Sequence, residues 1–230
     1  MYLHKFIAGA SQLSRRKIFT HVKNGEVSIN GKKELNFNAV VKLGDKVAIN
    51  NKVITFTSQP TYLVLYKPRQ VLTTLDDPFG RKTIVDCIPE KYANSRIFPV
   101  GRLDYESEGL LILTNDGDLS QKLTHPKYEK QKEYEVVVSY ELESRQLHIF
   151  KTGVKIESGY VTKPVIITKI GPKTYRIILT EGKKRQIRQM FSYFNIKVTR
   201  LIRTSIGPLK LSDLKIKSGE IKEIDPKIFE

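Results

Sequence analysis

The first sixty residues carry short helical and short extended patterns. Apolar residues recur every three or four positions over residues 2–10 and again over residues 14–23, which predicts two short helices. Ser14 is suited to begin the second helix because its hydroxyl can accept a backbone N–H, and Gly25 is a typical stop signal. Three short extended segments follow, at residues 27–29, 47–49 and 53–56. The first of them runs into Asn30-Gly31, a pair that favours a tight hairpin turn.

Longer patterns begin at residue 62, after a candidate linker at residues 56–61 that contains Ser, Gln and Pro. The apolar run at residues 110–113 is too short for a typical helix and is closed by Asn-Asp-Gly, so it predicts a strand buried on both faces. Further strands are predicted at residues 62–66, 134–138, 165–170 and 175–179, and helices near residues 118–124, 142–151 and 184–194. This irregular succession favours an α+β fold over a regular βαβ repeat.

Charge indicates the kind of partner. The 230 residues include 40 Lys and Arg against 24 Asp and Glu, a net charge of +16. Residues 1–60 hold ten basic and three acidic residues, so the first quarter of the chain carries nearly half of the excess. A surplus of this size attracts polyanions, of which nucleic acid is the commonest. Its uneven distribution predicts a small nucleic-acid-binding domain in front of a larger one.

Other features of the sequence limit its location. No apolar run approaches the roughly 20 residues that span a bilayer, so we expect no membrane partner. Residues 1–17 lack the continuous apolar stretch of a signal peptide. The single cysteine, Cys87, cannot form an internal disulfide. A cytoplasmic protein is therefore expected.

The second helix concentrates the basic residues of the first segment. The candidate RNA-binding residues there are Ser14, Arg15, Arg16, Lys17 and Lys23. Cations on one helix can pair with phosphate oxygens, although most charged runs are simply solvated faces. Together with residues 43–47, this segment resembles the S-four-type RNA-binding domain, a compact helix pair with a small strand unit found in several RNA-modifying enzymes. The resemblance covers residues 1–58 and, with the uneven charge, favours RNA contact.

A second group of residues centres on Asp104. It lies in a Gly-bracketed loop just before the buried strand, where rigid scaffolds often present reactive groups. From position alone, its carboxylate could be a nucleophile, a base, a metal ligand or an ordinary turn residue.

The surrounding motifs narrow this choice. Gly-Arg-Leu-Asp at residues 101–104 is followed by Gly-Leu-Leu at 109–111 and Thr-Asn-Asp-Gly at 114–117. This succession resembles the signature of pseudouridine synthases of the RsuA/RluB branch. Matching motifs occur at residues 66–68, 77–83, 132–136, 181–191 and 201–209, so the resemblance spans almost the whole chain. The chain departs from the family pattern at Ser107, where Thr is common, and at Gln189, where Arg is usual.

The resemblance implies a role for particular residues. Asp104 is the expected catalytic carboxylate, and Tyr134 is the expected aromatic that stacks on the target base. Arg188 is expected to keep Asp104 charged, because it lies at the margin of an apolar helix face from which it could reach back over the sheet. Arg102 is a candidate for filling the vacated base stack or holding phosphate. The remaining candidate RNA-binding residues are Lys183, Lys184 and Arg185.

The sequence therefore predicts an enzyme that isomerises a specific uridine to pseudouridine in ribosomal RNA, with large-subunit rRNA slightly favoured. The expected fold is an S-four-type α/β domain at residues 1–58, followed by a catalytic domain at 62–230 with a mixed, mainly antiparallel sheet flanked by helices. The substrate is ribosomal RNA or a pre-ribosomal particle, and the protein is expected to be a monomer.

No metal and no cofactor are expected, because the isomerisation has no net redox change and the sequence lacks dinucleotide, P-loop and zinc motifs. The alternative from another class is a non-catalytic RNA-binding or ribosome-assembly factor that kept the fold. A DNA-binding regulator is disfavoured, because the sequence has no recognisable helix-turn-helix or zinc finger.

Overall fold

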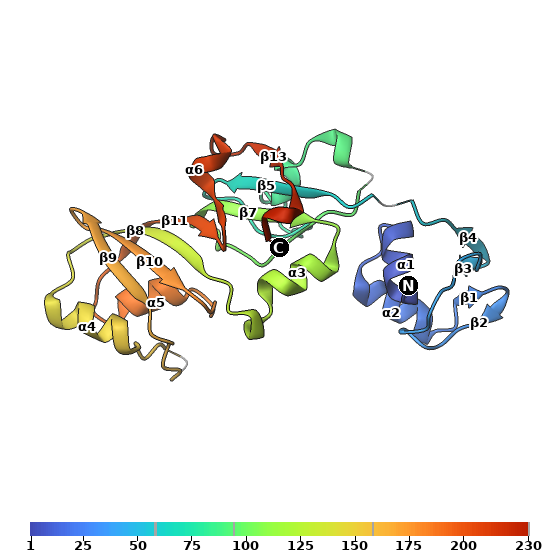
Figure 1. Cartoon of the computed structure of the whole chain (residues 1–230), viewed down its shortest axis with the longest axis horizontal. Helices are drawn as coiled ribbons and strands as arrows, with labels where there is room; N and C mark the ends of the chain where they lie inside the picture. The colour runs from blue at the N-terminus through green and yellow to red at the C-terminus, as the bar shows by residue number, and fades with distance from the viewer. Residues whose placement is uncertain (58, 94, 158, 230) are drawn as a thin grey trace. The chain divides into compact units, whose positions relative to one another are not determined.

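The computed structural model describes residues 1–57, 59–93, 95–157 and 159–229. It divides into two compact units (Figure 1). The first comprises Met1–Thr61 with Pro89–Ile97, and the second comprises Tyr62–Ile88 with Phe98–Glu230. Each unit has its own core, and each is described by itself.

The first unit combines two helices with a small antiparallel sheet. Helix α1 is Leu3–Ala10 and helix α2 is Arg15–Lys23. The sheet has the order β2-β1-β3-β4 and is formed by β1 (Val27–Ile29), β2 (Lys32–Lys33), β3 (Val47–Ile49) and β4 (Lys52–Ile54). Its core consists of apolar residues from both helices and the sheet, namely Leu3, Ile7, Ile18, Val22, Val27, Val41 and Val47.

Local signals explain the helix start and the hairpin of this unit. The Ser14 hydroxyl accepts the backbone N–H of Lys17 at 3.2 Å, which confirms Ser14 as the cap of α2. Asn30 and Gly31 join β1 to β2 with φ of 52° and 78°. Both values lie in the left-handed region that the predicted Asn-Gly hairpin turn requires.

The second unit is built on one mixed sheet. Within the described chain its strand order is β13-β5-β7-β11-β8-β10-β9, with β12 beside β11 and β6 beside β7. The strands are β5 (Tyr62–Lys67), β6 (Phe98–Pro99), β7 (Glu108–Thr114), β8 (Lys132–Val138), β9 (Ile166–Gly171), β10 (Thr174–Leu179), β11 (Val198–Ile206), β12 (Leu209–Lys210) and β13 (Ile221–Glu223). The pairing of β7 with β11 is parallel, and the other described pairings in this sheet are antiparallel.

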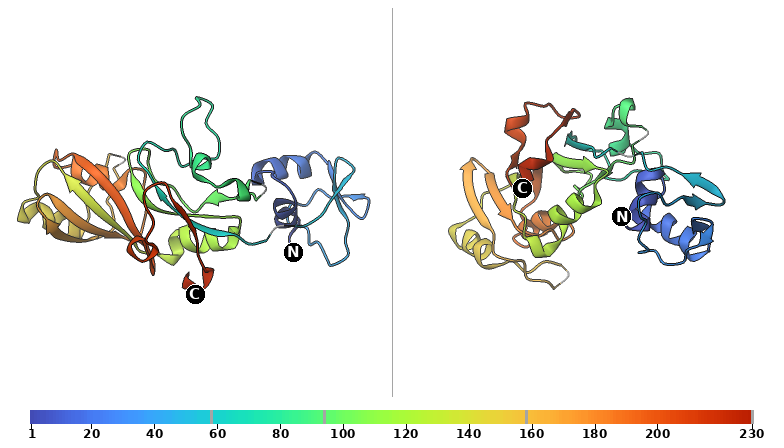
Figure 2. Two further views of the ribbon diagram at one scale, coloured as in Figure 1. Left: turned by 90° about the horizontal axis from the view of Figure 1, so that it is seen from above. Right: turned by 45° about the vertical axis from the view of Figure 1, so that its right-hand side comes forward.

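Helices cover this sheet in two places. Helices α4 (Ser144–Thr152) and α5 (Gln186–Ser192) lie against the part of the sheet formed by β8 and β10 (Figures 1 and 2). They pack there through Phe150, Met190 and Phe191. Helices α3 (Gly117–Thr124) and α6 (Leu211–Leu214) pack against β5 and β7. Short 3₁₀ turns occupy Ile84–Cys87, Glu90–Tyr92, Pro126–Tyr128 and Pro226–Phe229. None of the helices in the described ranges is long and apolar enough to cross a membrane.

Strand β7 is the centre of the second unit. All seven of its residues are buried, which confirms the prediction that the run at 110–113 is a strand covered on both faces. Gly109 pairs with Arg203 across the parallel contact with β11 and has a φ of 109°. A Cβ at Gly109 would lie 2.4 Å from the carbonyl oxygen of Arg203 and 2.6 Å from its nitrogen. The close pairing of β7 with β11 therefore requires glycine here.

The predicted helix at 184–194 is wrong at both ends, because α5 covers Gln186–Ser192. Gln186 holds the preceding loop closed: its Oε1 accepts the Lys183 N–H at 2.9 Å, and its Nε2 donates to Glu181 at 2.7 Å. Arg185 then adopts a left-handed φ of 51° to enter the helix. Lys184 and Arg185 are consequently loop residues. The predicted helix at 142–151 and the predicted strand at 53–56 likewise shorten or shift, to Ser144–Thr152 and Lys52–Ile54.

Replacing Gly109 with Ala should destabilise the second unit, because the new methyl group meets the backbone of Arg203. We expect the free energy of unfolding to fall by roughly 3 kcal/mol, from overpacking combined with a strained φ. Urea denaturation of the purified protein measures this change. Gly117→Ala is the matched control, because a Cβ there has open space and alanine favours the helix it begins. Equal stabilities of the two variants would contradict the packing argument.

Candidate active site

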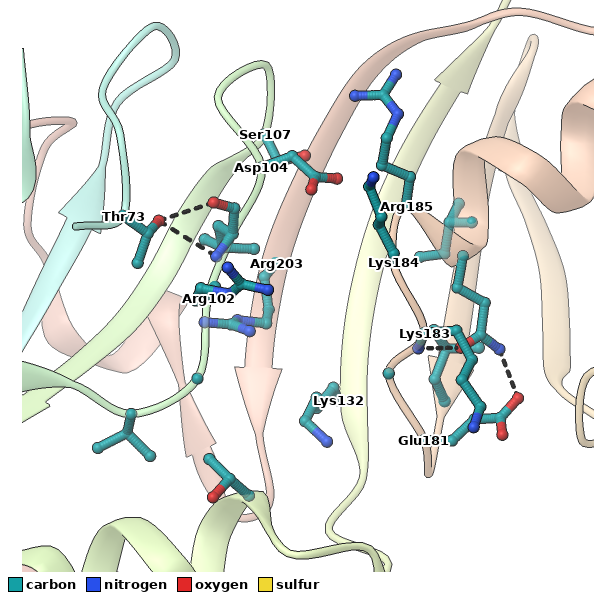
Figure 3. A pocket seen from close by; sticks show the side chains of 18 of the residues that line it. Thr73, Arg102, Asp104, Ser107, Lys132, Glu181, Lys183, Lys184, Arg185 and Arg203 are labelled. Atoms are coloured by element: carbon teal, nitrogen blue, oxygen red, sulfur yellow. Dashed lines mark hydrogen bonds between the residues drawn. The ribbon is translucent and has the colours of Figure 1, made fainter. Parts of the chain in front are cut away.

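A pocket of about 880 Å³ lies over one face of the second unit's sheet (Figure 3). Alternate residues of two strands face the pocket, namely Lys132 and Tyr134 of β8 and Leu201 and Arg203 of β11. The Asp104 loop borders it on one side and the loop of Lys183, Lys184 and Arg185 on the other. Among the described lining residues, nine Lys and Arg accompany four carboxylates, at Asp76, Asp77, Asp104 and Glu181.

The Asp104 loop is held by the loop that follows β5. The Thr73 hydroxyl donates to the Leu103 carbonyl at 2.7 Å and accepts the Leu103 N–H at 3.3 Å. After Asp104 the chain turns, and the Ser107 N–H donates to the Asp104 carbonyl at 3.0 Å. The carbonyl of Tyr105, within that turn, accepts the backbone N–H of Gln70 at 2.8 Å. The backbone on both sides of Asp104 is therefore fixed.

Two buried or half-buried cations hold the end of the same turn. Arg188 of α5 donates to the carbonyl of Glu106 at 3.0 Å. Lys67, at the end of β5, donates to the carbonyl of Ser107 at 2.8 Å. Carbonyl oxygens from Leu103 to Ser107 thus each accept a hydrogen bond, which restricts the backbone that presents the Asp104 carboxylate.

Arg188 reaches the Asp104 loop, as its helical position suggested, but it contacts the backbone of that loop. Its guanidinium donates to the Val198 carbonyl and the Glu106 carbonyl, both at 3.0 Å, and approaches the Ser107 hydroxyl at 3.4 Å. Within the described ranges no ion pair joins it to Asp104, and it is not among the residues that line the pocket. Burial lowers the pKa of Arg188, and the neighbouring Arg185 lowers it further, whereas Asp104 and Glu106 act in the opposite direction.

Tyr134 lies where the pocket meets the core. It is half-buried on β8 and packs against the cluster formed by β8, β10 and helices α4 and α5. Its ring borders the same cavity as Asp104. In the sheet it pairs with Arg203 of β11 on one side and Ile177 of β10 on the other.

The other predicted RNA-binding residues fall into two groups. Arg102, Lys183, Lys184 and Arg185 are exposed and line the pocket. The Lys183 ammonium also lies 4.3 Å from the centroid of the Tyr160 ring. Arg15, Arg16, Lys17 and Lys23 are exposed on α2, in the first unit, and are not part of this pocket.

Sequence reasoning did not single out three further cations near the pocket, Lys67, Lys132 and Arg203. Lys67 is fully buried, and burial lowers its pKa to about 8. The pKa of Lys132 is also lowered, first by burial and then by the charge of Arg203. Lys67 and Lys132 lie within the family motifs at residues 66–68 and 132–136, and this was the available signal.

Comparisons with known proteins agree with this fold. The sequence pattern of the RNA pseudouridylate synthase family matches residues 61–193. A protein of Bacillus subtilis (strain 168) named ribosomal large subunit pseudouridine synthase B is 36% identical over 97% of this chain and 92% of its own length. A Salmonella typhi protein named dual-specificity RNA pseudouridine synthase RluF is 36% identical over 96% of this chain and 75% of its own length.

A solved structure supports the same assignment. A crystal structure of a pseudouridylate synthase matches with a TM-score of 0.72 at 25% sequence identity, over 100% of this chain and 98% of the other. The chain belongs to the RNA pseudouridylate synthase family and is an enzyme of the isomerase class.

The buried Lys67 should make stability depend on pH. Its pKa is about 8 in the folded protein against 10.5 ordinarily, so between these values the unfolded chain binds more protons and stability rises with pH. The free energy of unfolding of the wild type relative to Lys67→Met should therefore increase from pH 8 to pH 10, by roughly 3 kcal/mol at most. Urea denaturation at several pH values measures it, with exposed Lys122→Met as control. If the difference in unfolding free energy between the wild type and Lys67→Met stays constant from pH 8 to pH 10, the lowered pKa of Lys67 is contradicted.

Proposed function

We propose that the protein converts a specific uridine of ribosomal RNA to pseudouridine with Asp104 as the catalytic carboxylate. The observation that carries this proposal is the position of Asp104, whose loop is fixed by five successive carbonyl contacts at the edge of a cation-lined pocket. The relatives named for large-subunit rRNA favour that RNA as the substrate.

The reaction breaks the bond between the sugar C1′ and the ring nitrogen N1, turns the base, and joins C1′ to C5. The hydrogen on C5 is lost as a proton and N1 gains one, so atoms balance without a redox partner. Asp104 is ionised in this scheme, and it acts on either the sugar or the base. A paired uridine is out of reach inside a helix, so the target is flipped out or lies in an unpaired segment.

Other site residues support this chemistry in our proposal. Tyr134 offers a ring face on which the target base stacks. Arg188 positions the Asp104 turn by holding the Glu106 carbonyl. Arg102, which is exposed beside Asp104, fills the vacated stack or holds phosphate. The exposed loop of Lys183, Lys184 and Arg185 contacts the RNA backbone.

Residues 1–58 form an S-four-type RNA-binding domain in this proposal, and residues 62–230 form the catalytic domain. The helix pair with a small sheet and the exposed cations Arg15, Arg16, Lys17 and Lys23 support the first part. The substrate is ribosomal RNA or a pre-ribosomal particle. The protein acts in the cytoplasm as a monomer.

Asp104→Asn keeps the size of the side chain but removes its charge. We expect it to lower the rate of pseudouridine formation on the order of a thousandfold or more, because the reaction depends on that carboxylate. Release of tritium from an rRNA transcript labelled at uridine C5 measures the rate. Asp76→Asn is the matched control, since Asp76 lines the same pocket and should retain near-normal activity. Comparable rates for both variants would remove Asp104 from the chemistry.

The cations of α2 should contribute to RNA affinity. Replacing Arg15, Arg16 and Lys17 together with Ala should weaken binding and reduce the slope of log affinity against log salt by about 2, because phosphate contacts release counterions. Filter binding of rRNA at several salt concentrations measures this. The charge-matched control replaces the exposed Lys215, Lys217 and Lys227 of the second unit with Ala. If the salt slope falls by the same amount in both triple variants, the change reflects net charge and not a contact between α2 and RNA.

A further inference from the structure

Arg203 is a buried cation with an incomplete set of partners. It lies in the middle of β11 with 3% of its surface exposed. Its Nε donates to the Leu110 carbonyl of β7 at 2.8 Å. Its Nη2 is fully covered and has no hydrogen-bond partner on the protein in the described chain. Burying a charged donor without a partner costs free energy, so the position calls for an explanation other than stability.

The register of the sheet places Arg203 next to the proposed base-stacking residue. Arg203 pairs with Gly109 of β7 on one side and with Tyr134 of β8 on the other. Side chains of directly opposed residues project from the same face of a sheet, and both Arg203 and Tyr134 line the pocket. Figure 3 shows Arg203 on the side of the pocket that carries Arg102 and Asp104. A base stacked on Tyr134 would therefore present an edge to Arg203.

The charges around Arg203 favour an electron-rich ligand. Arg203 lowers the pKa of Lys132, after burial, and makes a smaller contribution in the same direction at Lys67, where neighbouring acidic groups act in the opposite direction. Lys132 and Arg203 both line the pocket. The nearby carboxylate of Glu108 is already bound by Arg200, at 2.8 and 3.2 Å. The floor of the pocket consequently carries more positive than negative charge.

We propose that Arg203 binds a carbonyl oxygen of the target uracil and stabilises the negative charge that this base acquires during the reaction. This inference rests on the proposed function. The depth of Arg203 in the pocket favours the base over a phosphate as its ligand. Lys183, Lys184 and Arg185 are exposed at the rim, where a phosphate stays partly hydrated, whereas Arg203 lies at the floor, which an inserted base reaches.

The electron balance shows why a cation helps at this place. When the N1–C1′ bond breaks, its electron pair stays with the uracil ring and spreads onto the two carbonyl oxygens. A guanidinium hydrogen-bonded to one of them holds that charge and fixes the base while it turns. Arg203 remains protonated throughout and forms no covalent bond. Because Nη2 is covered, the contact requires a side chain in the pocket to shift when the base enters.

The test combines Arg203 variants with altered substrates. Synthetic RNA fragments carry uridine, 2-thiouridine or 4-thiouridine at the position that the wild-type enzyme modifies. Sulfur is a weaker hydrogen-bond acceptor than oxygen, so one of the two thio substrates should slow the wild type about tenfold to a hundredfold under single-turnover conditions. Arg203→Gln should be slower on uridine by a similar factor and should show no further loss on that thio substrate. Its affinity for RNA should change little.

Two further variants control for structure. Arg203→Lys keeps the charge and should recover part of the uridine rate and part of the thio effect. Arg203→Met, which is uncharged, replaces Arg203→Gln in the comparison if the latter does not fold. Arg176→Gln removes an exposed arginine from the opposite face of the sheet and should keep the full thio effect. Thermal unfolding confirms that each variant is folded.

An equal thio effect in the wild type and in the uncharged Arg203 variant, or none in the wild type, would overturn the proposal. An Arg203 variant that loses RNA affinity equally for a fragment with no base at the target position would indicate a phosphate contact and would overturn it as well. If the wild-type protein modifies no uridine in whole rRNA or in pre-ribosomal particles, the proposed function fails instead.

Discussion

The parallel contact between β7 and β11 is the constraint on which the site depends. Gly109 lets the two strands approach so closely that a Cβ would meet the Arg203 backbone at 2.4 Å. This contact joins the two halves of the sheet, because β5 and β13 lie on the β7 side and β8, β10 and β9 on the β11 side. It also sets the place where β7 begins, and with it the end of the loop that carries Asp104. A looser pairing would move Asp104 relative to Tyr134.

The backbone of the Asp104 loop is held mainly by hydrogen bonds from residues outside the loop. Its carbonyl groups are bound by Thr73, Gln70, Lys67 and Arg188, which come from other parts of the second unit. Two of these partners are cations at half-buried or buried positions, where a charge-assisted hydrogen bond is stronger than in water. The cost of burying Lys67 is visible in its lowered pKa of about 8. Holding this one turn in place therefore lowers the stability of the protein to some extent.

The sequence predicted local structure well and distant contacts poorly. Apolar spacing identified α1, α2 and the buried core of β7, because these signals lie within a few residues. It placed the start of α5 too early, since the left-handed Arg185 and the Gln186 contacts that close the preceding loop leave no periodic signal. The motifs identified Asp104 and Tyr134 as candidates. Nothing local could show that Arg203 lies between Gly109 and Tyr134, because this neighbourhood exists only after distant strands pair.

Mapping of pseudouridine in both rRNAs tests the central claim most directly. The comparison uses cells that lack the gene and the same cells with the wild-type gene restored. We predict that one uridine, in large-subunit rRNA, is unmodified without the gene and becomes pseudouridine again when the gene is restored. An identical pseudouridine pattern with and without the gene would contradict the claim that ribosomal RNA is the substrate.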